Sequence, residues 1–202
     1  MGEYYDNAMK NAALAIDVGA TKVAVGLVAS DGELLARVDI SSKVATLDEL
    51  NDSLATAIAQ VCHRDGVRIL GAGIGSAGPI DKDKGTINPV NIAHWVDFSL
   101  VDFVKKVSGI KEVRIIGDAS ALAYAEFRLG AGRGATNLMG IVVSTGIGGG
   151  VVLNGQFHVG RTGNAGYIGH AVVVQNGNLC ACGQRGCVEA YASGTKDRKS
   201  VV

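Results

Sequence analysis

The sequence lacks the features that would direct it to a membrane, to nucleic acid or out of the cell. Its 19 basic and 19 acidic side chains leave no net charge, so no charge excess points to nucleic acid or a membrane surface. No apolar run reaches the roughly 18 residues that a membrane span needs. The opening residues MGEYYDNAMKNAA lack the basic and then apolar layout of a signal peptide. These absences predict an ordinary soluble, cytoplasmic protein, and the 48% hydrophobic content is enough for a core.

Cysteine is scarce outside one short segment, CACGQRGCVE, at residues 180–189. In a reducing compartment a disulfide is the less expected use of such a cluster. Cys180, Cys182 and Cys187 offer three soft ligands, and His170, ten residues upstream, is a candidate fourth. We therefore predict a structural zinc site; the alternative is a group of free thiols. Cys62 stands alone and is expected in the core, on the apolar side of a helix.

Two stretches of the chain follow the same plan. Residues 14–40, LAIDVGATKVAVGLVASDGELLARVDI, and residues 138–160, LMGIVVSTGIGGGVVLNGQFHVG, each read as strand, glycine-rich turn, strand, hairpin and strand. The repeat predicts two similarly built lobes. Glycines in the first turns allow positive φ and close approach of backbone N–H groups to phosphate, so a nucleotide is expected between the lobes.

The two turns supply the candidate nucleotide contacts. In the first turn, Asp17 is placed to approach a Mg²⁺–phosphate unit, and Thr21 and Lys22 to contact phosphate oxygens. For these residues a turn or strand-edge role is the alternative, and for Lys22 it is the favoured one. The complete set of predicted nucleotide-binding residues is Asp17, Gly19, Thr21, Lys22, Thr145, Gly146 and Gly148.

Between the two copies, helices and strands alternate, which predicts an α/β fold. A capping box from Thr46 to Glu49 and apolar residues at helical spacing predict a helix over residues 44–65, with Gly66 as its stop. Ser99 is expected to cap a second helix that ends at Gly109.

Asp118 follows a predicted strand, VRIIG, and opens a predicted helix. One interpretation is a helix N-cap that accepts backbone N–H bonds. The other is catalytic: the helix dipole keeps the carboxylate ionised, ready to orient a substrate hydroxyl and accept its proton during phosphoryl transfer. We favour Asp118 as a general base.

Together these stretches resemble the ROK family of bacterial sugar kinases and repressors, which has the actin-like, ribonuclease H-like ATPase fold. The resemblance runs from about Leu14 to Gly194. IDVGATK and STGIGGG match its phosphate loops, GIGSAGPID and NPVNIAHW its sugar-pocket segments, GDAS its catalytic motif, and GNAGYIGH with CACGQRGCVEAYASG its zinc and sugar signature. It implies two lobes with mixed sheets, residues 12–118 and 119–202, the second incomplete because family kinases are longer.

The resemblance further implies ATP-dependent phosphorylation of a hexose or hexose derivative, with Mg²⁺, structural zinc, Asp118 as base and a possible homodimer. His170 would serve both the zinc and the sugar. The implied sugar-binding residues are Gly78, Asn91, Asp118, Tyr167, His170 and Glu189.

Three positions depart from the family pattern. Gly117 stands where an asparagine is usual, Tyr167 replaces a sugar-binding glutamate, and Ala77 replaces a proline. Tyr167 would suit stacking on a pyranose face or admit a larger group such as N-acetyl, so glucose is not assigned. A catalytically silent sugar-binding or regulatory protein is the alternative function. A DNA-binding repressor is not expected, because only 13 residues precede Leu14.

Overall fold

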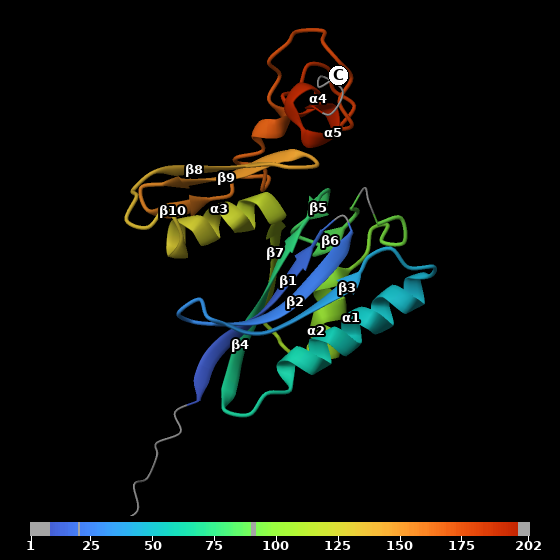
Figure 1. The fold of residues 1–202 in the computed structure, drawn as a ribbon, viewed down its shortest axis with the longest axis vertical. Coiled ribbons are helices and arrows are strands. Elements are labelled where there is room, and N and C mark those ends of the chain that lie inside the picture. Colours follow the sequence, from blue (N-terminus) through green and yellow to red (C-terminus); the bar gives the residue numbers. More distant parts are fainter. Residues whose placement is uncertain (1–8, 20, 90–91, 198–202) are drawn as a thin grey trace, which may run out of the picture. The chain divides into compact units, whose positions relative to one another are not determined.

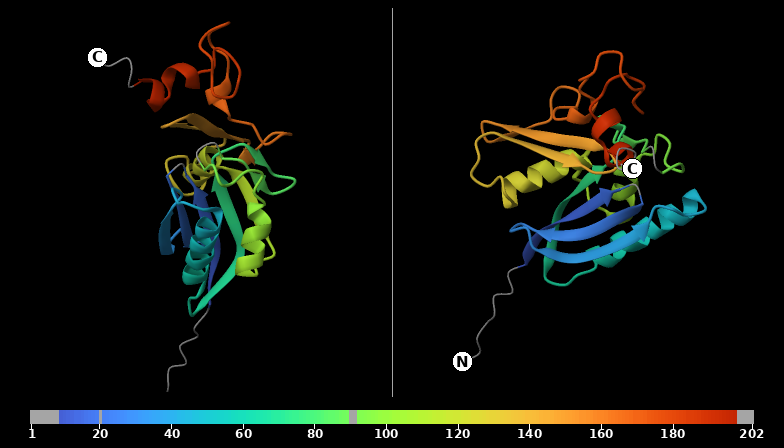
Figure 2. Two further views of the ribbon diagram at one scale, coloured as in Figure 1. Left: turned by 90° about the vertical axis from the view of Figure 1, so that its right-hand side faces the viewer. Right: turned by 45° about the horizontal axis from the view of Figure 1, so that its top comes forward.

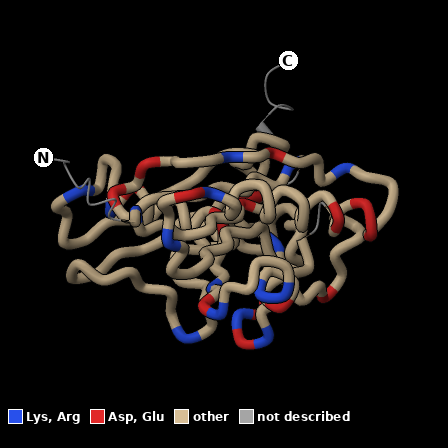
Figure 3. The backbone as a smooth tube through the Cα atoms, turned by 90° about the horizontal axis from the view of Figure 1, so that it is seen from below, with Lys and Arg blue, Asp and Glu red and all other residues tan. Residues whose placement is uncertain are grey.

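The computed structural model describes residues 9–19, 21–89 and 92–197 and has an α/β fold (Figure 1). The chain divides into two compact units, Met1–Asp118 and Ala119–Val202. Lys and Arg residues are interspersed with Asp and Glu along the chain (Figure 3). Across the described ranges, no helix combines the length and the apolar character needed to span a membrane.

The first unit is built on a five-stranded mixed sheet. Its strand order is β3 (Leu34–Ser41), β2 (Lys22–Ala29), β1 (Lys10–Val18), β4 (Val67–Ser76) and β7 (Val113–Gly117). The first three strands form the predicted antiparallel meander, and β4 and β7 run parallel to β1. The predicted turn between β2 and β3 is confirmed: Gly32 has a φ of 91°, and its N–H donates to the Ala29 carbonyl at 2.9 Å.

Two helices pack on one face of this sheet, α1 (Leu47–Cys62) and α2 (Leu100–Ser108) (Figure 1). Their apolar faces and alternate residues of β1, β2 and β4 form one continuous core, because successive strand residues point to opposite faces. Its members include Leu14, Ile16, Val18, Val23, Val25, Leu50, Leu54, Ile58, Ile74, Leu100 and Val104. Cys62 packs against this core, as expected.

The predicted cap of α1 is confirmed, because Thr46 Oγ1 accepts the Glu49 N–H at 3.1 Å. The prediction that Gly66 stops this helix is wrong. The helix ends at Cys62, and Gly66, with a φ of 72°, lies in the turn to β4, where its carbonyl accepts the Lys10 N–H. α2 ends at Gly109 as predicted, in the left-handed region, but the Ser99 side chain makes no capping bond.

Between β4 and α2, the chain forms a short ribbon, β5 (Ile80–Asp81) with β6 (Thr86–Ile87), and then a segment anchored by Trp95. The Trp95 side chain is fully buried and stacks on Phe98 with ring centroids 5.0 Å apart. Its Nε1–H donates to Asn51 Oδ1 on α1 at 3.2 Å. Residues 92–98 are therefore fixed to the core of the first unit.

The second unit has a three-stranded antiparallel sheet in the order β10 (Gln156–His158), β9 (Ile147–Leu153) and β8 (Leu138–Val143). Helix α3 (Asp118–Leu129) lies along this sheet (Figure 2). The predicted hairpin is confirmed, since Asn154 and Gly155 have φ of 52° and 73°. Beyond the sheet lie the 3-10 turn η1 (Ile168–His170) and two short helices, α4 (Glu189–Ala192) and α5 (Gly194–Asp197).

Candidate functional site

Two carboxylates lie at the same edge of the first unit's sheet. Asp17 is near the end of β1, where it pairs with Gly75 of β4, and Asp118 follows directly after β7. Because β1, β4 and β7 are parallel, their carboxyl ends meet at one edge. Desolvation raises the pKa of the Asp17 carboxyl group, and the negative charge of Asp118 raises it further. Two such carboxylates suit a divalent cation and a proton acceptor.

Asp118 is the first residue of α3 and its side chain is exposed. At the start of a helix, the backbone N–H groups and the helix dipole attract negative charge. The preceding Gly117, the last residue of β7, carries no side chain that could supply an amide beside it.

Polar groups of the turn between β1 and β2 form hydrogen bonds within the protein. The Gly19 N–H donates to the Lys22 carbonyl at 3.0 Å, and the Thr21 carbonyl accepts the Ser42 N–H at 3.3 Å. Lys22 Nζ lies 2.9 Å from Asp39 Oδ2 on β3, in agreement with the strand-edge alternative. Arg37 and then Lys22 lower the pKa of Asp39 to about 2.

The predicted sugar-pocket segments follow β4 and β6. Gly78 lies between β4 and β5 and precedes a cis peptide bond to Pro79. Asn91 lies outside the described residues. The segment that follows it is held by Trp95, and by a hydrogen bond between His94 Nε2 and the Val44 carbonyl at 3.0 Å.

The glycine-rich stretch that begins β9 fits tightly against α3. A Cβ at Gly148 would stand 2.6 Å from the Ala119 Cβ, and one at Gly150 would stand 2.9 Å from the Ala123 Cβ. Gly19, Gly146 and Gly148 have no φ in the left-handed region, so the positive φ that glycine allows is not used at these positions. At Gly146 and Gly148 the close approach of a neighbouring side chain leaves too little room for a Cβ.

The turn between β8 and β9, residues 144–146, together with Ile147 at the start of β9, is referred to below as the second loop. Its Ile147 N–H donates to Glu189 Oε2 at 2.7 Å. The Ser144 carbonyl accepts the Gly194 N–H at 2.8 Å, and the Thr145 carbonyl accepts the Thr195 hydroxyl at 3.3 Å. Sequence reasoning missed Thr195 because roughly 50 residues separate it from Thr145, and no spacing rule links them.

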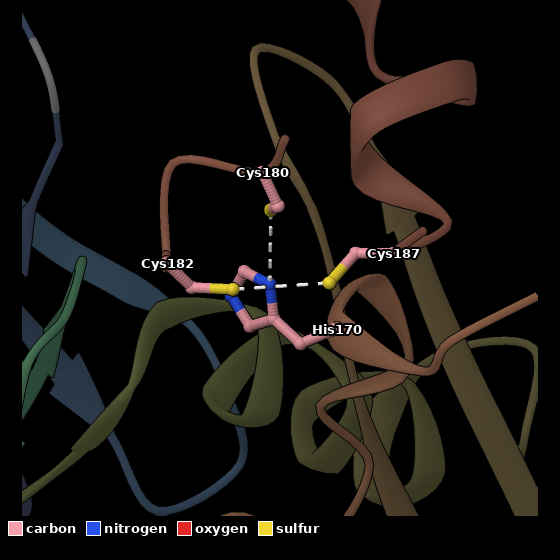
Figure 4. Close-up of side chains that lie close together, drawn as sticks. All are labelled: His170, Cys180, Cys182 and Cys187. Carbon is pink, nitrogen blue, oxygen red and sulfur yellow. Dashed lines mark hydrogen bonds between the residues drawn. The ribbon is translucent and has the colours of Figure 1, made fainter. Parts of the chain in front are cut away.

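The four predicted metal ligands converge in the second unit (Figure 4). The ligand atoms of His170, Cys180, Cys182 and Cys187 all lie within 4.8 Å of one another. Cys180 Sγ is 3.7 Å from His170 Nδ1, and Cys182 Sγ is 3.8 Å from Cys187 Sγ. The cysteines are free.

These distances fit zinc. Tetrahedral bonds of about 2.3 Å to sulfur place two sulfur ligands about 3.8 Å apart. Cys180 and Cys187 are buried, and burial raises the pKa of the Cys187 thiol to about 11. The Gln184 backbone N–H lowers the pKa of the exposed Cys182. A bound zinc would hold the sulfurs as thiolates, and three thiolates with one imidazole complete a closed, structural coordination shell.

Tyr167 and Glu189 flank this cluster along the chain. The Tyr167 ring lies next to the His170 ring, with centroids 6.2 Å apart and a tilt of 34°. Glu189 begins α4, two residues after Cys187, and is half-buried. The predicted sugar-binding residues of the second unit are thus adjacent in sequence or space to the metal ligands.

Comparisons with known proteins point to one protein family. The model of the ROK family matches residues 13–201. The chain is 39% identical over 183 residues to the N-acetylmannosamine kinase of Yersinia pestis (strain Pestoides F), covering 90% of this chain and 61% of that protein.

Among solved structures, the ROK hexokinase from Thermus thermophilus matches with a TM-score of 0.83 and 35% identity, over 94% of this chain and 63% of that one. A ROK family glucokinase from Streptomyces griseus, in complex with glucose and AMPPNP, matches with a TM-score of 0.76 and 35% identity, over 92% and 58%. The chain therefore spans about three fifths of the length of these relatives.

Proposed function

The chain belongs to the ROK family, and we propose that it forms the sugar- and nucleotide-binding part of an ATP-dependent sugar kinase. Its fold is the actin-like α/β ATPase fold of the solved ROK hexokinase and ROK glucokinase, as the sequence predicted. The observation that carries the proposal is the pair of carboxylates, Asp17 and Asp118, at the carboxyl edge of the parallel strands.

In this proposal Asp118 is the general base. It accepts the proton of a sugar hydroxyl as that oxygen bonds to the γ-phosphorus of ATP, while the bond from phosphorus to the ADP oxygen breaks. Asp17 holds Mg²⁺, which when bound neutralises charge on the phosphates. Thr21 and the second loop, with Thr145 and Gly146, contact phosphate oxygens.

We further propose that the acceptor is a hexose or an N-acetylhexosamine. Tyr167, where the family has a glutamate, favours a sugar with a larger substituent, and the relative at 39% identity is an N-acetylmannosamine kinase. Gly78, Asn91, His170 and Glu189 complete the proposed sugar site, and zinc on the cysteine cluster keeps His170 in place. A cytoplasmic location, where thiols stay reduced, and assembly as a homodimer belong to the same proposal.

One specific observation favours a second candidate, a silent sugar-binding protein. Gly117 and Tyr167 remove one amide and one carboxylate that family members use to orient the sugar, each worth about 0.5–3 kcal/mol. The two candidates differ in turnover: sugar-dependent ADP release identifies a kinase, and sugar binding without ADP release identifies the silent binder.

The test is a coupled ADP-release assay with ATP over hexoses, N-acetylhexosamines and their analogues, with metal analysis of the same protein. The decisive variant is Asp118→Asn, for which we expect about a 10²- to 10⁴-fold lower kcat. Its matched control is Asp102→Asn, since Asp102 is also an exposed carboxylate in the first turn of a helix, α2. If both variants lose the same small amount of stability and no activity, Asp118 is only a helix-terminal charge.

A further inference from the structure

The peptide groups around Ile147 are held on two sides by the segments that carry metal ligands. On the amide side, the Ile147 N–H donates to the Glu189 carboxylate at 2.7 Å, and Glu189 stands two residues after Cys187. On the carbonyl side, Gly169 lies so close to the Ile147 oxygen that no side chain would fit there. Gly169 directly precedes His170.

These two ligand-bearing segments also contact each other. The Val188 N–H donates to the Ala171 carbonyl at 3.0 Å, and Val172 and Cys187 form an antiparallel bridge. A metal bound by His170 and Cys187 would therefore crosslink the segments at the point where both reach the second loop.

Gly146 shows how closely Glu189 fits. A Cβ at this position would stand 2.6 Å from Glu189 Oε2. Because the obstacle is the end of a flexible side chain, an added methyl group would displace the carboxylate and leave the backbone in place. A glycine in the second loop is thus explained by the approach of Glu189.

We propose that Glu189 is a positioning residue for the second loop, and that the metal centre holds Glu189 and Gly169 against that loop. Metal occupancy then sets the order of the second loop and, through it, the affinity for a nucleotide polyphosphate. The nucleotide part rests on the proposed function, whereas the ordering of the loop does not. This role is separate from the proposed contact of Glu189 with a sugar.

The first experiment is hydrogen exchange of peptides covering residues 144–150, measured by mass spectrometry without sugar or ATP. A hydrogen bond to a charged acceptor protects an amide by about 10- to 100-fold, so Glu189→Ala should speed exchange at Ile147 by this factor. Glu189→Gln keeps an acceptor oxygen and should restore most of the protection. Chelation of the wild-type protein should speed exchange in the same peptides.

Three measurements separate these effects from misfolding. Glu189→Ala should still bind one zinc ion per chain and keep wild-type exchange in β1 and β2. Gly146→Ala, which displaces the carboxylate without removing it, should reproduce the loss of protection. The matched control is Glu126→Ala, because the Glu126 carboxylate also accepts a backbone N–H, that of Ala131 at 2.9 Å, elsewhere in the second unit. It should leave residues 144–150 unchanged.

The second experiment is calorimetric titration with AMPPNP. Glu189→Ala should weaken nucleotide binding at least tenfold, and Glu189→Gln should recover most of it. Unchanged exchange at residues 144–150 in folded, zinc-loaded Glu189→Ala, or in the chelated wild type, overturns the proposal. If exchange changes as expected but the wild type binds no nucleotide, the loop anchor stands and the proposed kinase function fails.

Discussion

Replacing Gly148 by alanine tests whether the glycine run of β9 serves packing or ligand binding. The added Cβ would stand 2.6 Å from the Ala119 Cβ, whereas two carbon atoms at their optimal separation are about 3.5–4.0 Å apart. Ala119 is in the first turn of α3, so its Cβ moves only with the helix backbone. We expect a loss of about 1–3 kcal/mol in the unfolding free energy of the second unit.

The Ala119→Gly substitution supplies the second edge of a double-mutant cycle. Alone, it should cost about 1 kcal/mol through helix propensity. Combined with Gly148→Ala, it removes the clashing methyl group, so the double variant should be more stable than the sum of the single effects predicts. The coupling energy should be about 0.5–3 kcal/mol.

Urea unfolding followed by circular dichroism gives the unfolding free energies of these variants. Hydrogen exchange in residues 138–153 shows whether the loss of stability lies in the second unit. Each kcal/mol should lower Tm by about 4–8 °C for a unit of this size. Gly73→Ala is the control, because a Cβ at that strand position would meet nothing within 4 Å. If Gly148→Ala is as stable as wild type and weakens only nucleotide binding, the packing argument is refuted.

Two predictions concern the first unit. Asp17→Asn should raise stability at neutral pH, since desolvation and Asp118 raise the folded-state pKa of Asp17 above its ordinary 3.8. A raised carboxyl pKa means that ionisation of Asp17 opposes folding. The stability gained by Asp17→Asn should therefore grow as pH rises through the folded-state pKa and vanish below the unfolded-state pKa. Urea unfolding at several pH values measures this gain, and a gain that does not change with pH would contradict an electrostatic origin. Asn51→Ala leaves the buried Trp95 N–H without its acceptor and should cost about 1–3 kcal/mol. Fluorescence of Trp95, the sole tryptophan, reports the unfolding of the first unit. The control is Gln60→Ala on the exposed side of α1, which should leave the unfolding free energy unchanged.

Much of the fold was predictable because its signals are local. The apolar alternation of β1 and β2, the capping box at Thr46 and the turn residues Asn154 and Gly155 each depend on neighbours within a few positions. The end of α1 was misplaced because Gly66 is used for a different turn, where its carbonyl pairs with the Lys10 N–H.

The glycines at 146 and 148 were recognised from the sequence, but the protein groups that pack against them were not. Sequence shows that a side chain is absent, and it does not show what occupies the space. The occupants are the Glu189 carboxylate beside Gly146 and the Ala119 methyl group beside Gly148, both contributed by other elements of the second unit.

The sequence by itself determined the family, the α/β pattern and the identity of four candidate metal ligands, because motif spacing, periodicity and ligand chemistry are properties of short segments. Only the tertiary structure decided which groups meet across long separations. In the folded chain Asp17 and Asp118 lie at one edge of the sheet, and the Ile147 N–H donates to the Glu189 carboxylate. Such contacts depend on how strands pair and how segments pack, and these arrangements exist only once the chain has folded.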